Sequence, residues 1–201
     1  MERCLAHIVF DGPGGQLEGL LELKESSWGA VLCHPHPLYG GSMDDLVIQA
    51  LHSSLAGQNC STLRFNFRGV GASVGSHDKG DGEADDVAAA VAYLKSQGSS
   101  QIVLAGYSFG AAMCLKTDLQ VKPDAMVLVA PPIQMFDGLS EPESPCLVLL
   151  GSEDQIVAAE ETAAWFRNSQ VELIDGADHF FFGAQGQIER LVSERGAVLW
   201  N

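Results

Sequence analysis

The sequence predicts an α/β protein in which a mostly parallel, twisted sheet is covered by helices on both faces. Short apolar runs alternate along the chain with segments whose apolar residues recur at helical spacing. Runs such as 102–105 and 146–150 contain no polar side chain, which is typical of parallel strands buried on both faces. The chain has 201 residues, 46% of them hydrophobic, and shows neither a linker nor an internal repeat. A single domain spanning 1–201 is therefore expected.

The first elements expected are a hairpin, a strand and a helix. Strands at 7–11 and 17–23 flank the turn-rich Gly-Pro-Gly-Gly segment at 12–15, and a third strand covers 30–33. A helix is expected from Asp44 to Gly57, because apolar residues between Leu46 and Leu55 recur at helical spacing. Asp44 and Asp45 stand in its first turn, where the helix dipole favours negative charge.

The second half of the chain repeats the pattern of strand and helix. Strands are expected at 62–67, 102–105, 125–130, 146–150 and 171–174, and a helix of small residues at 108–119. Two further helices are predicted from apolar stripes, one formed by Val87, Ala90, Val91 and Leu94, the other by Ile188, Leu191, Val192, Val198 and Leu199.

The charge balance excludes several classes of partner. The chain has 11 basic and 26 acidic residues, a net charge of −15, so its surface should repel nucleic-acid phosphates and anionic lipid headgroups. No apolar run reaches the ~18 residues that a membrane helix needs, and no signal-peptide pattern opens the chain. Five widely spaced cysteines, Cys4, Cys33, Cys60, Cys114 and Cys146, are expected to be buried and reduced. A cytoplasmic location follows from these features.

The pentapeptide from Gly106 to Gly110 is the strongest functional signal. Ser108 lies at its centre, between an apolar strand and a helical segment. A serine on such a sharp turn presents its hydroxyl at a helix N-terminus, and glycines two positions away allow close packing of strand and helix. We therefore predict Ser108 to be a nucleophile rather than a helix cap.

A serine nucleophile needs a base and an acid that orients the base. In a nucleophile-elbow fold these follow in the order serine, acid, histidine, each after a strand. Asp154 follows the strand at 146–150, and His179 follows the strand at 171–174. Glu153 is the alternative acid, whereas Asp175 and Asp178 are expected to face solvent.

At this point the sequence resembles the α/β-hydrolase superfamily. It is most similar to a lidless bacterial branch of predicted small hydrolases, which resembles dienelactone hydrolases and small esterases. The matching stretches are LCHPHPLYGGSMD at 32–44, RFNFRGVGAS at 64–73, the pentapeptide, GSEDQIV at 151–157 and GADHF at 176–180. The resemblance covers about residues 30 to 182 and implies a carboxylic-ester hydrolase that forms an acyl-enzyme on Ser108.

The resemblance also implies an oxyanion hole. One donor would be the backbone N–H of Phe109, and the other that of His36 in the segment His-Pro-His-Pro at 34–37, where the two prolines have no N–H. Arg68 is expected to tie this oxyanion loop to the sheet, with direct substrate binding as the alternative. Supporting or pocket-lining positions are expected at His34, Tyr39, Gly40 and Gly41.

The same residues are compatible with several alternative functions. A thioesterase or an amidase-like enzyme would use the same residues. His34 and His36 with Asp44 or Asp45 would suit a metal-dependent hydrolase, although the flanking prolines constrain both rings. A third alternative is a non-catalytic binding module that retains the fold. No cofactor is expected, because a dinucleotide fingerprint at 69–75 would need glycine where Val74 stands.

The substrate is predicted to be a small, soluble acyl compound. Only the segment 131–145 separates two expected strands where many hydrolases insert a helical cap, and it contains Pro131, Pro132, Pro142 and Pro145. Two cap helices cannot be built from so few residues with so many prolines, so no cap domain is expected. The sequence does not decide between a monomer and a homo-oligomer.

Overall fold

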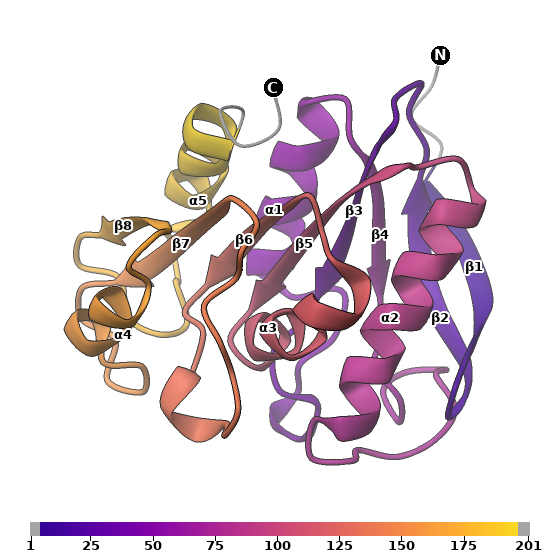
Figure 1. Cartoon of the computed structure of the whole chain (residues 1–201), viewed down its shortest axis with the longest axis horizontal. Coiled ribbons are helices and arrows are strands. Elements are labelled where there is room, and N and C mark those ends of the chain that lie inside the picture. The colour runs from indigo at the N-terminus through magenta and orange to yellow at the C-terminus, as the bar shows by residue number, and fades with distance from the viewer. Residues whose placement is uncertain (1–4, 197–201) are drawn as a thin grey trace.

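One eight-stranded sheet organises the chain in the computed structural model, which describes residues 5–196 (Figure 1). Its strands lie in the order β1-β2-β4-β3-β5-β6-β7-β8. Their bounds are β1 Leu5–Gly12, β2 Gly15–Glu22, β3 Trp28–Cys33, β4 Ser61–Phe65, β5 Gln101–Tyr107, β6 Ala125–Val129, β7 Cys146–Gly151 and β8 Gln170–Ile174.

The sheet is mostly parallel, as the sequence predicts. Strands β4, β3, β5, β6, β7 and β8 run parallel, whereas the β1–β2 hairpin adds two antiparallel strands at one edge. Every residue of β4, β6 and β7 is buried, because helices cover both faces of the parallel part. This position explains why β6 and β7 contain no charged or hydroxyl side chain.

The helices form layers on opposite faces of the sheet. Helices α2 (Asp81–Ser96) and α3 (Phe109–Val121) pack together in front of it in Figure 1, and α1 (Leu46–Gly57) packs behind it with α5 (Gln185–Leu191). A short helix, α4 (Ala159–Trp165), precedes β8, and α5 continues into one π-helical segment, Val192–Gly196. The expected positions Val198 and Leu199, like Cys4, lie outside the described residues.

Some element boundaries differ from the prediction. Strand β4 ends at Phe65 rather than at residue 67, because the N–H of Phe67 donates to the ring of His34 and not to a neighbouring strand. Helix α1 begins at Leu46, and Asp45 is its N-cap, with Oδ1 accepting a hydrogen bond from the N–H of Val47 at 2.8 Å.

The strand register brings the ends of distant segments together. Cys33, the last residue of β3, is level with Phe65 of β4 on one side and with Gly106 of β5 on the other. At the other side of the sheet Gly151 of β7 is level with Ile174 of β8. The loops that follow these strands therefore meet at the edge of the sheet formed by the carboxyl ends of its parallel strands, where ligands bind in open α/β folds.

No cap domain covers this edge from the segment 131–145. That segment contains one short 3₁₀ helix, Ile133–Met135, and otherwise no helix or strand. This confirms the expectation of a fold without a lid.

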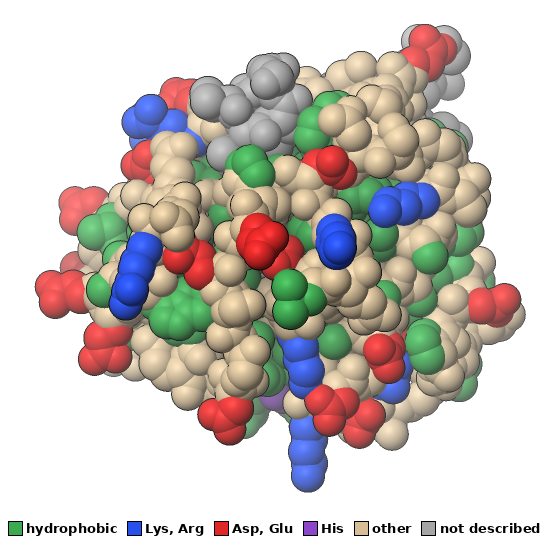
Figure 2. Space-filling model, viewed as in Figure 1, with side chains coloured by type: hydrophobic (Ala, Val, Ile, Leu, Met, Phe, Trp, Pro, Cys, Tyr) green, Lys and Arg blue, Asp and Glu red, His purple; other side chains and the backbone are tan. Residues whose placement is uncertain are grey.

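The surface and the cysteines show two further features. Lys and Arg side chains are scattered among Asp and Glu over the face in Figure 2 and form no continuous basic patch there. Of the helices within 5–196, none is long and apolar enough to cross a membrane. The four described cysteines are buried and free of disulfides, as expected: Cys33, Cys60, Cys114 and Cys146.

Candidate active site

Ser108 occupies a strained turn between β5 and α3. Its backbone has φ 52° and ψ −119°, a left-handed conformation that non-glycine residues rarely adopt. A Cβ on Gly106 would lie 2.6 Å from Ala111 N, and one on Gly110 would lie 2.0 Å from Cys33 O. The two glycines are therefore required by close backbone packing, and this packing holds the serine in its strained conformation.

The three residues predicted as a triad lie in contact. Ser108 Oγ is 2.9 Å from His179 Nε2, and His179 Nδ1 is 2.7 Å from Asp154 Oδ2. They follow β5, β8 and β7 respectively, so the parallel sheet brings together residues that are up to 71 positions apart. This geometry joins a hydroxyl, an imidazole and a carboxylate by two consecutive hydrogen bonds.

The Asp154 carboxylate is held rigidly and stays ionised. Its side chain is fully buried, and its Oδ1 accepts hydrogen bonds from the N–H groups of Ile156 and Val157, each at 2.8 Å. Burial raises the pKa of Asp154, but the hydrogen bonds from His179, Val157 and Ile156 outweigh burial, so the pKa lies below its ordinary value. Glu153, the alternative acid, is exposed.

Tyr107 fixes the loop that carries the histidine. Its hydroxyl donates a 2.7 Å hydrogen bond to the backbone carbonyl of His179, and its ring packs edge-on against the buried Phe181. No role of Tyr107 was predicted from the sequence. Its position next to Ser108 was the one sequence feature that could have indicated a role. A hydrogen bond to a residue 72 positions away leaves no local sequence pattern.

The predicted oxyanion donors lie beside the nucleophile. The rings of His36 and Phe109 are 4.9 Å apart, so the loop after β3 reaches the first residue of α3. Among the described residues, no protein acceptor receives the backbone N–H of either His36 or Phe109. Both N–H groups therefore remain available to an outside acceptor, as the predicted oxyanion hole requires.

His34 supports this loop from below and does not line a pocket. Its ring is fully buried; Nε2 accepts from the N–H of Phe67 at 3.0 Å, and Nδ1 donates to Pro35 O at 2.6 Å. Burial lowers its pKa from 6.5 to about 4, so the ring is neutral near pH 7. With both nitrogens engaged, His34 cannot pair with His36 as a metal ligand, which removes the basis of that alternative.

Arg68 does not tie the oxyanion loop to the sheet, as its sequence position predicts, but pairs with Asp86. Its Nε and Nη2 donate to the two carboxylate oxygens of Asp86 at 2.9 and 2.7 Å, so it joins the loop after β4 to α2 rather than to the oxyanion loop. The link from β4 to the oxyanion loop is made one residue earlier, by Phe67 and His34. The expectation was wrong because the sequence does not show which acidic residue meets Arg68.

The loop residues Tyr39, Gly40 and Gly41 lie near the site but differ in role. Tyr39 is 88% exposed and contacts the ring of His36, whereas a Cβ on Gly41 would lie 2.1 Å from Pro35 O. Gly41 therefore allows the loop to fold closely on itself. Of the three, Gly40 lines the cavity next to the triad.

That cavity, which we call the triad-side cavity, has a volume of about 270 Å³. It is lined by Gly40, Ser42, Asp44, Asp45, Leu46, Tyr107, Phe180 and Phe182. Of the supporting or pocket positions predicted from the sequence, only Gly40 is among these lining residues. The run of three phenylalanines after His179 was the available signal for Phe180 and Phe182, since three aromatic residues in a row are unusual on a loop, where at least one of them is left exposed.

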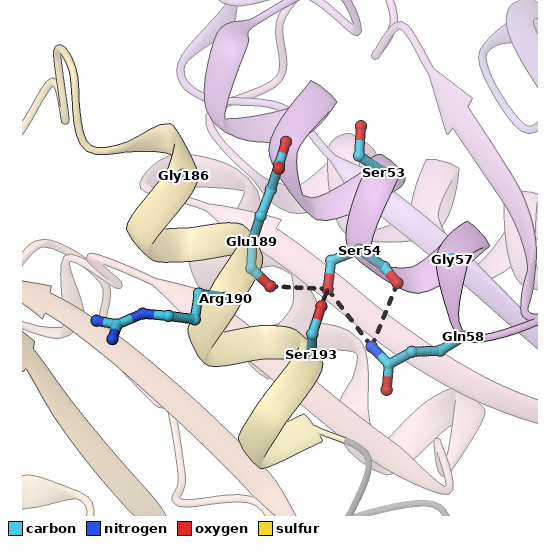
Figure 3. A pocket seen from close by; sticks show the side chains of 8 residues that line it. All are labelled: Ser53, Ser54, Gly57, Gln58, Gly186, Glu189, Arg190 and Ser193. Carbon is cyan, nitrogen blue, oxygen red and sulfur yellow. Dashed lines mark hydrogen bonds between the residues drawn. The ribbon is translucent and has the colours of Figure 1, made fainter.

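A larger hollow of about 520 Å³ lies between α1 and α5 (Figure 3). It adjoins the C-terminal half of α1, away from the helix start at the triad-side cavity. Ser54 Oγ contacts Ser193 Oγ at 2.9 Å and Glu189 O at 3.2 Å, and Gln58 reaches Ser54 as well. These polar groups serve to join the two helices.

The described residues contain no cluster suited to a metal ion. No group of three or more His, Cys, Asp and Glu side chains between residues 5 and 196 is arranged to hold one. Asp45 caps α1, and the side chain of Asp44 lies 3.8 Å from Arg64 Nη1.

A family profile and a curated relative match this chain. The profile is described as the alpha/beta hydrolase family and matches residues 30–144, which include Ser108 but end before Asp154 and His179. The uncharacterized protein RP471 of Rickettsia prowazekii is 33% identical over 198 residues, which cover 88% of this chain and 82% of that protein.

Solved structures are similar over nearly the whole chain. An alpha-beta serine hydrolase homologue from Coxiella burnetii superposes with a TM-score of 0.89 at 34% identity, covering 94% of this chain and 96% of that one. XC6422 from Xanthomonas campestris, described as a serine hydrolase without lid, has a TM-score of 0.85 at 30% identity, covering 95% and 94%. A chain of unknown function from Agrobacterium tumefaciens, ATU1826, described as a putative alpha/beta hydrolase, has a TM-score of 0.87 at 28% identity, covering 96% and 97%.

Proposed function

Because this chain belongs to the alpha/beta hydrolase family, we propose that it is a serine hydrolase that cleaves small carboxylic esters. The observation that carries the proposal is the line of contacts from Ser108 Oγ through the His179 ring to the buried carboxylate of Asp154. Such a line supplies the base and the orienting acid that a serine needs in order to attack a carbonyl carbon.

In this mechanism His179 Nε2 accepts the proton of Ser108 as Oγ bonds to the ester carbonyl carbon. The N–H groups of His36 and Phe109 then donate to the oxyanion of the tetrahedral intermediate. The intermediate expels the alcohol, which takes the proton from His179, and leaves an acyl group on Ser108. Water then attacks the acyl carbon while the same ring takes its proton, and the ring returns that proton to Ser108 Oγ as the C–Oγ bond breaks and the acid leaves. Asp154 holds the imidazole in the orientation and tautomer that both steps need.

The experiment that tests the proposal measures ester hydrolysis and serine labelling together. The wild-type protein is expected to hydrolyse p-nitrophenyl acetate and to bind one fluorophosphonate per chain. Ser108→Ala should lose the labelling and about 10⁴- to 10⁶-fold of the rate while keeping its circular-dichroism spectrum. A thioester and an amide in the same acyl series would identify the preferred acyl bond.

A matched control separates the nucleophile from ordinary surface serines. Ser53→Ala removes an exposed hydroxyl on α1 and should leave both the rate and the labelling unchanged. Retention of most of the activity by Ser108→Ala, or labelling at another residue, would overturn the proposal. A folded wild-type protein that is neither labelled nor active on any ester would favour the binding-module alternative.

A further inference from the structure

The triad-side cavity opens directly beside the reacting groups. Two of its lining residues contact the catalytic ring: the centroid of the His179 ring lies 5.8 Å from that of Tyr107 and 5.9 Å from that of Phe180. The hydrogen bond from the Tyr107 hydroxyl to the His179 carbonyl joins these two parts of the wall. A substrate whose ester carbonyl meets Ser108 can therefore place a neighbouring group in this cavity.

Two aromatic rings are held at the cavity in exposed positions. Phe180 and Phe182 are 54% and 77% exposed, and their rings stack with centroids 5.9 Å apart. Phe181 between them is fully buried with φ 53°, and Asp178 Oδ1 accepts the N–H groups of Phe180 and Phe181 at 2.9 and 3.1 Å. The backbone thus turns both rings outward, where their negative faces can attract a cation.

Two carboxylates, those of Asp44 and Asp45, also belong to residues that line the cavity. Asp45 caps α1 and so offsets the positive end of that helix, whereas the side chain of Asp44 is 67% exposed. Arg64 Nη1 lies 3.8 Å from Asp44 Oδ1, but the Arg64 side chain is 8% exposed, donates to Met43 O and is not among the residues that line the cavity. Negative charge is therefore nearer to the cavity than positive charge.

The surroundings of Tyr107 indicate the same sign of charge. Burial raises the pKa of this phenol, and the carboxylates of Asp45, Asp154 and Asp178 raise it further. A field that disfavours a phenolate also disfavours a substrate carboxylate and favours a cation.

We propose that the triad-side cavity is a substrate subsite for an alkylammonium group joined by a short chain to the ester. The inference rests on the proposed hydrolase function and adds a substrate class to it. The ring faces of Phe180 and Phe182 and the carboxylate of Asp44 contact the cation. A neutral group of the same shape loses both attractions, and a carboxylate is repelled.

The first experiment compares three acetate esters that differ in one terminal group. Acetylcholine carries a quaternary ammonium, 3,3-dimethylbutyl acetate replaces its nitrogen with carbon, and 3-acetoxypropanoate carries a carboxylate. We expect kcat/KM, measured in a pH-stat at low salt, to be about tenfold higher for the cation than for its neutral isostere. The carboxylate should be the poorest of the three, and added salt should reduce the difference.

Variants assign the preference to the cavity. Asp44→Asn and Phe180→Leu should each lower the ratio of cation to neutral ester by about threefold or more, since each removes one attraction. Asp85→Asn removes an exposed carboxylate on α2, on the opposite face of the sheet from α1, and should leave the ratio unchanged.

A binding measurement makes the inference independent of turnover. Ser108→Ala, titrated calorimetrically with the cationic ester and its neutral isostere, should bind the cation more tightly, and adding Asp44→Asn should remove the difference. Equal binding, tighter binding of the neutral ester, or no binding of either at millimolar concentration would overturn the inference. Hydrolysis of the neutral ester would leave the proposed function standing in each of these cases.

Discussion

The imidazole of His179 and the carboxylate of Asp154 lie 2.7 Å apart, and the carboxylate is fully buried. Because two backbone N–H groups occupy the other oxygen of Asp154, the carboxylate has one orientation in which it can meet the ring. This fixed geometry allows the carboxylate to select the tautomer in which Nε2 of His179 is free to accept a proton.

Asp154→Asn should therefore abolish most of the activity without unfolding the protein. The amide oxygen can still accept the N–H groups of Ile156 and Val157, but the amide nitrogen then faces His179 Nδ1 and favours the wrong tautomer. We expect kcat for p-nitrophenyl acetate to fall about 10⁴-fold. The exposed Asp175→Asn is the control and should keep full activity. A rate within tenfold of wild type for Asp154→Asn would assign the acid elsewhere, with Glu153 tested next.

Protonation of His34 should make the protein less stable in acid. Its pKa is about 4 in the folded chain and 6.5 when unperturbed, so between these values the unfolded chain binds a proton that the folded chain does not. The contribution of neutral His34 to the free energy of unfolding is therefore fully present above pH 6.5. About 3 kcal/mol of it should be lost as the pH falls to 4.

Urea titrations at pH 7 and pH 4 measure this loss. His34→Gln keeps an acceptor for the N–H of Phe67 but does not titrate, so its loss of stability over this range should be about 3 kcal/mol smaller than that of the wild type. His7→Gln, at an exposed position on β1, should behave as the wild type does. An equal loss in the His34 variant would show that the acid sensitivity arises at other groups.

Gly110→Ala should damage both stability and catalysis. The added methyl group would meet the backbone of Cys33 and His34, which cannot move without displacing β3 or α3. We expect a cost of about 1–3 kcal/mol or more in the free energy of unfolding. We also expect kcat to fall at least about tenfold, because the N–H of Phe109 and the oxyanion loop separate.

Gly57→Ala is the matched control for this change. Gly57 is the last residue of α1, and nothing lies within 4 Å of its added Cβ. Its replacement should leave kcat unchanged and raise the stability by up to about 1 kcal/mol. Wild-type stability and activity in Gly110→Ala would contradict the close packing of α3 on β3.

The missing cap should appear in the dependence on acyl chain length. Because the segment 131–145 forms only one short helix, it provides little surface to enclose a long chain. We expect kcat/KM for p-nitrophenyl esters to be highest for acetate and butyrate and to fall as the chain lengthens. Kinetics should be hyperbolic, with no jump in rate at the critical micelle concentration. A preference for chains longer than about ten carbons would require cover from another subunit.

The strands, the helices and the three contacting residues could be predicted from the sequence. The side-chain partners and the cavity lining around those three residues could not. Ser108, Asp154 and His179 each follow an apolar run, and chain order with strand ends is enough to bring them together. The partner of Arg68 could not be predicted in this way, because Asp86 lies in the middle of a helix and periodicity shows only which residues are buried. Most of the cavity lining was missed for a similar reason, since the wall combines two loops with the start of α1 and the end of β5, and these segments share no sequence pattern.

The position of β8 has a consequence for how the protein fails under stress. This strand lies at the edge of the sheet and pairs with β7, and its Leu173 is 58% exposed. Edge elements with few buried contacts open at a lower free energy than the centre of a sheet. Since His179 follows β8, local opening there separates the base from Ser108 while β3, β5 and β6 stay paired. In mild denaturant the protein should therefore be inactivated before it loses its overall fold, and it should regain activity on dilution without having to refold.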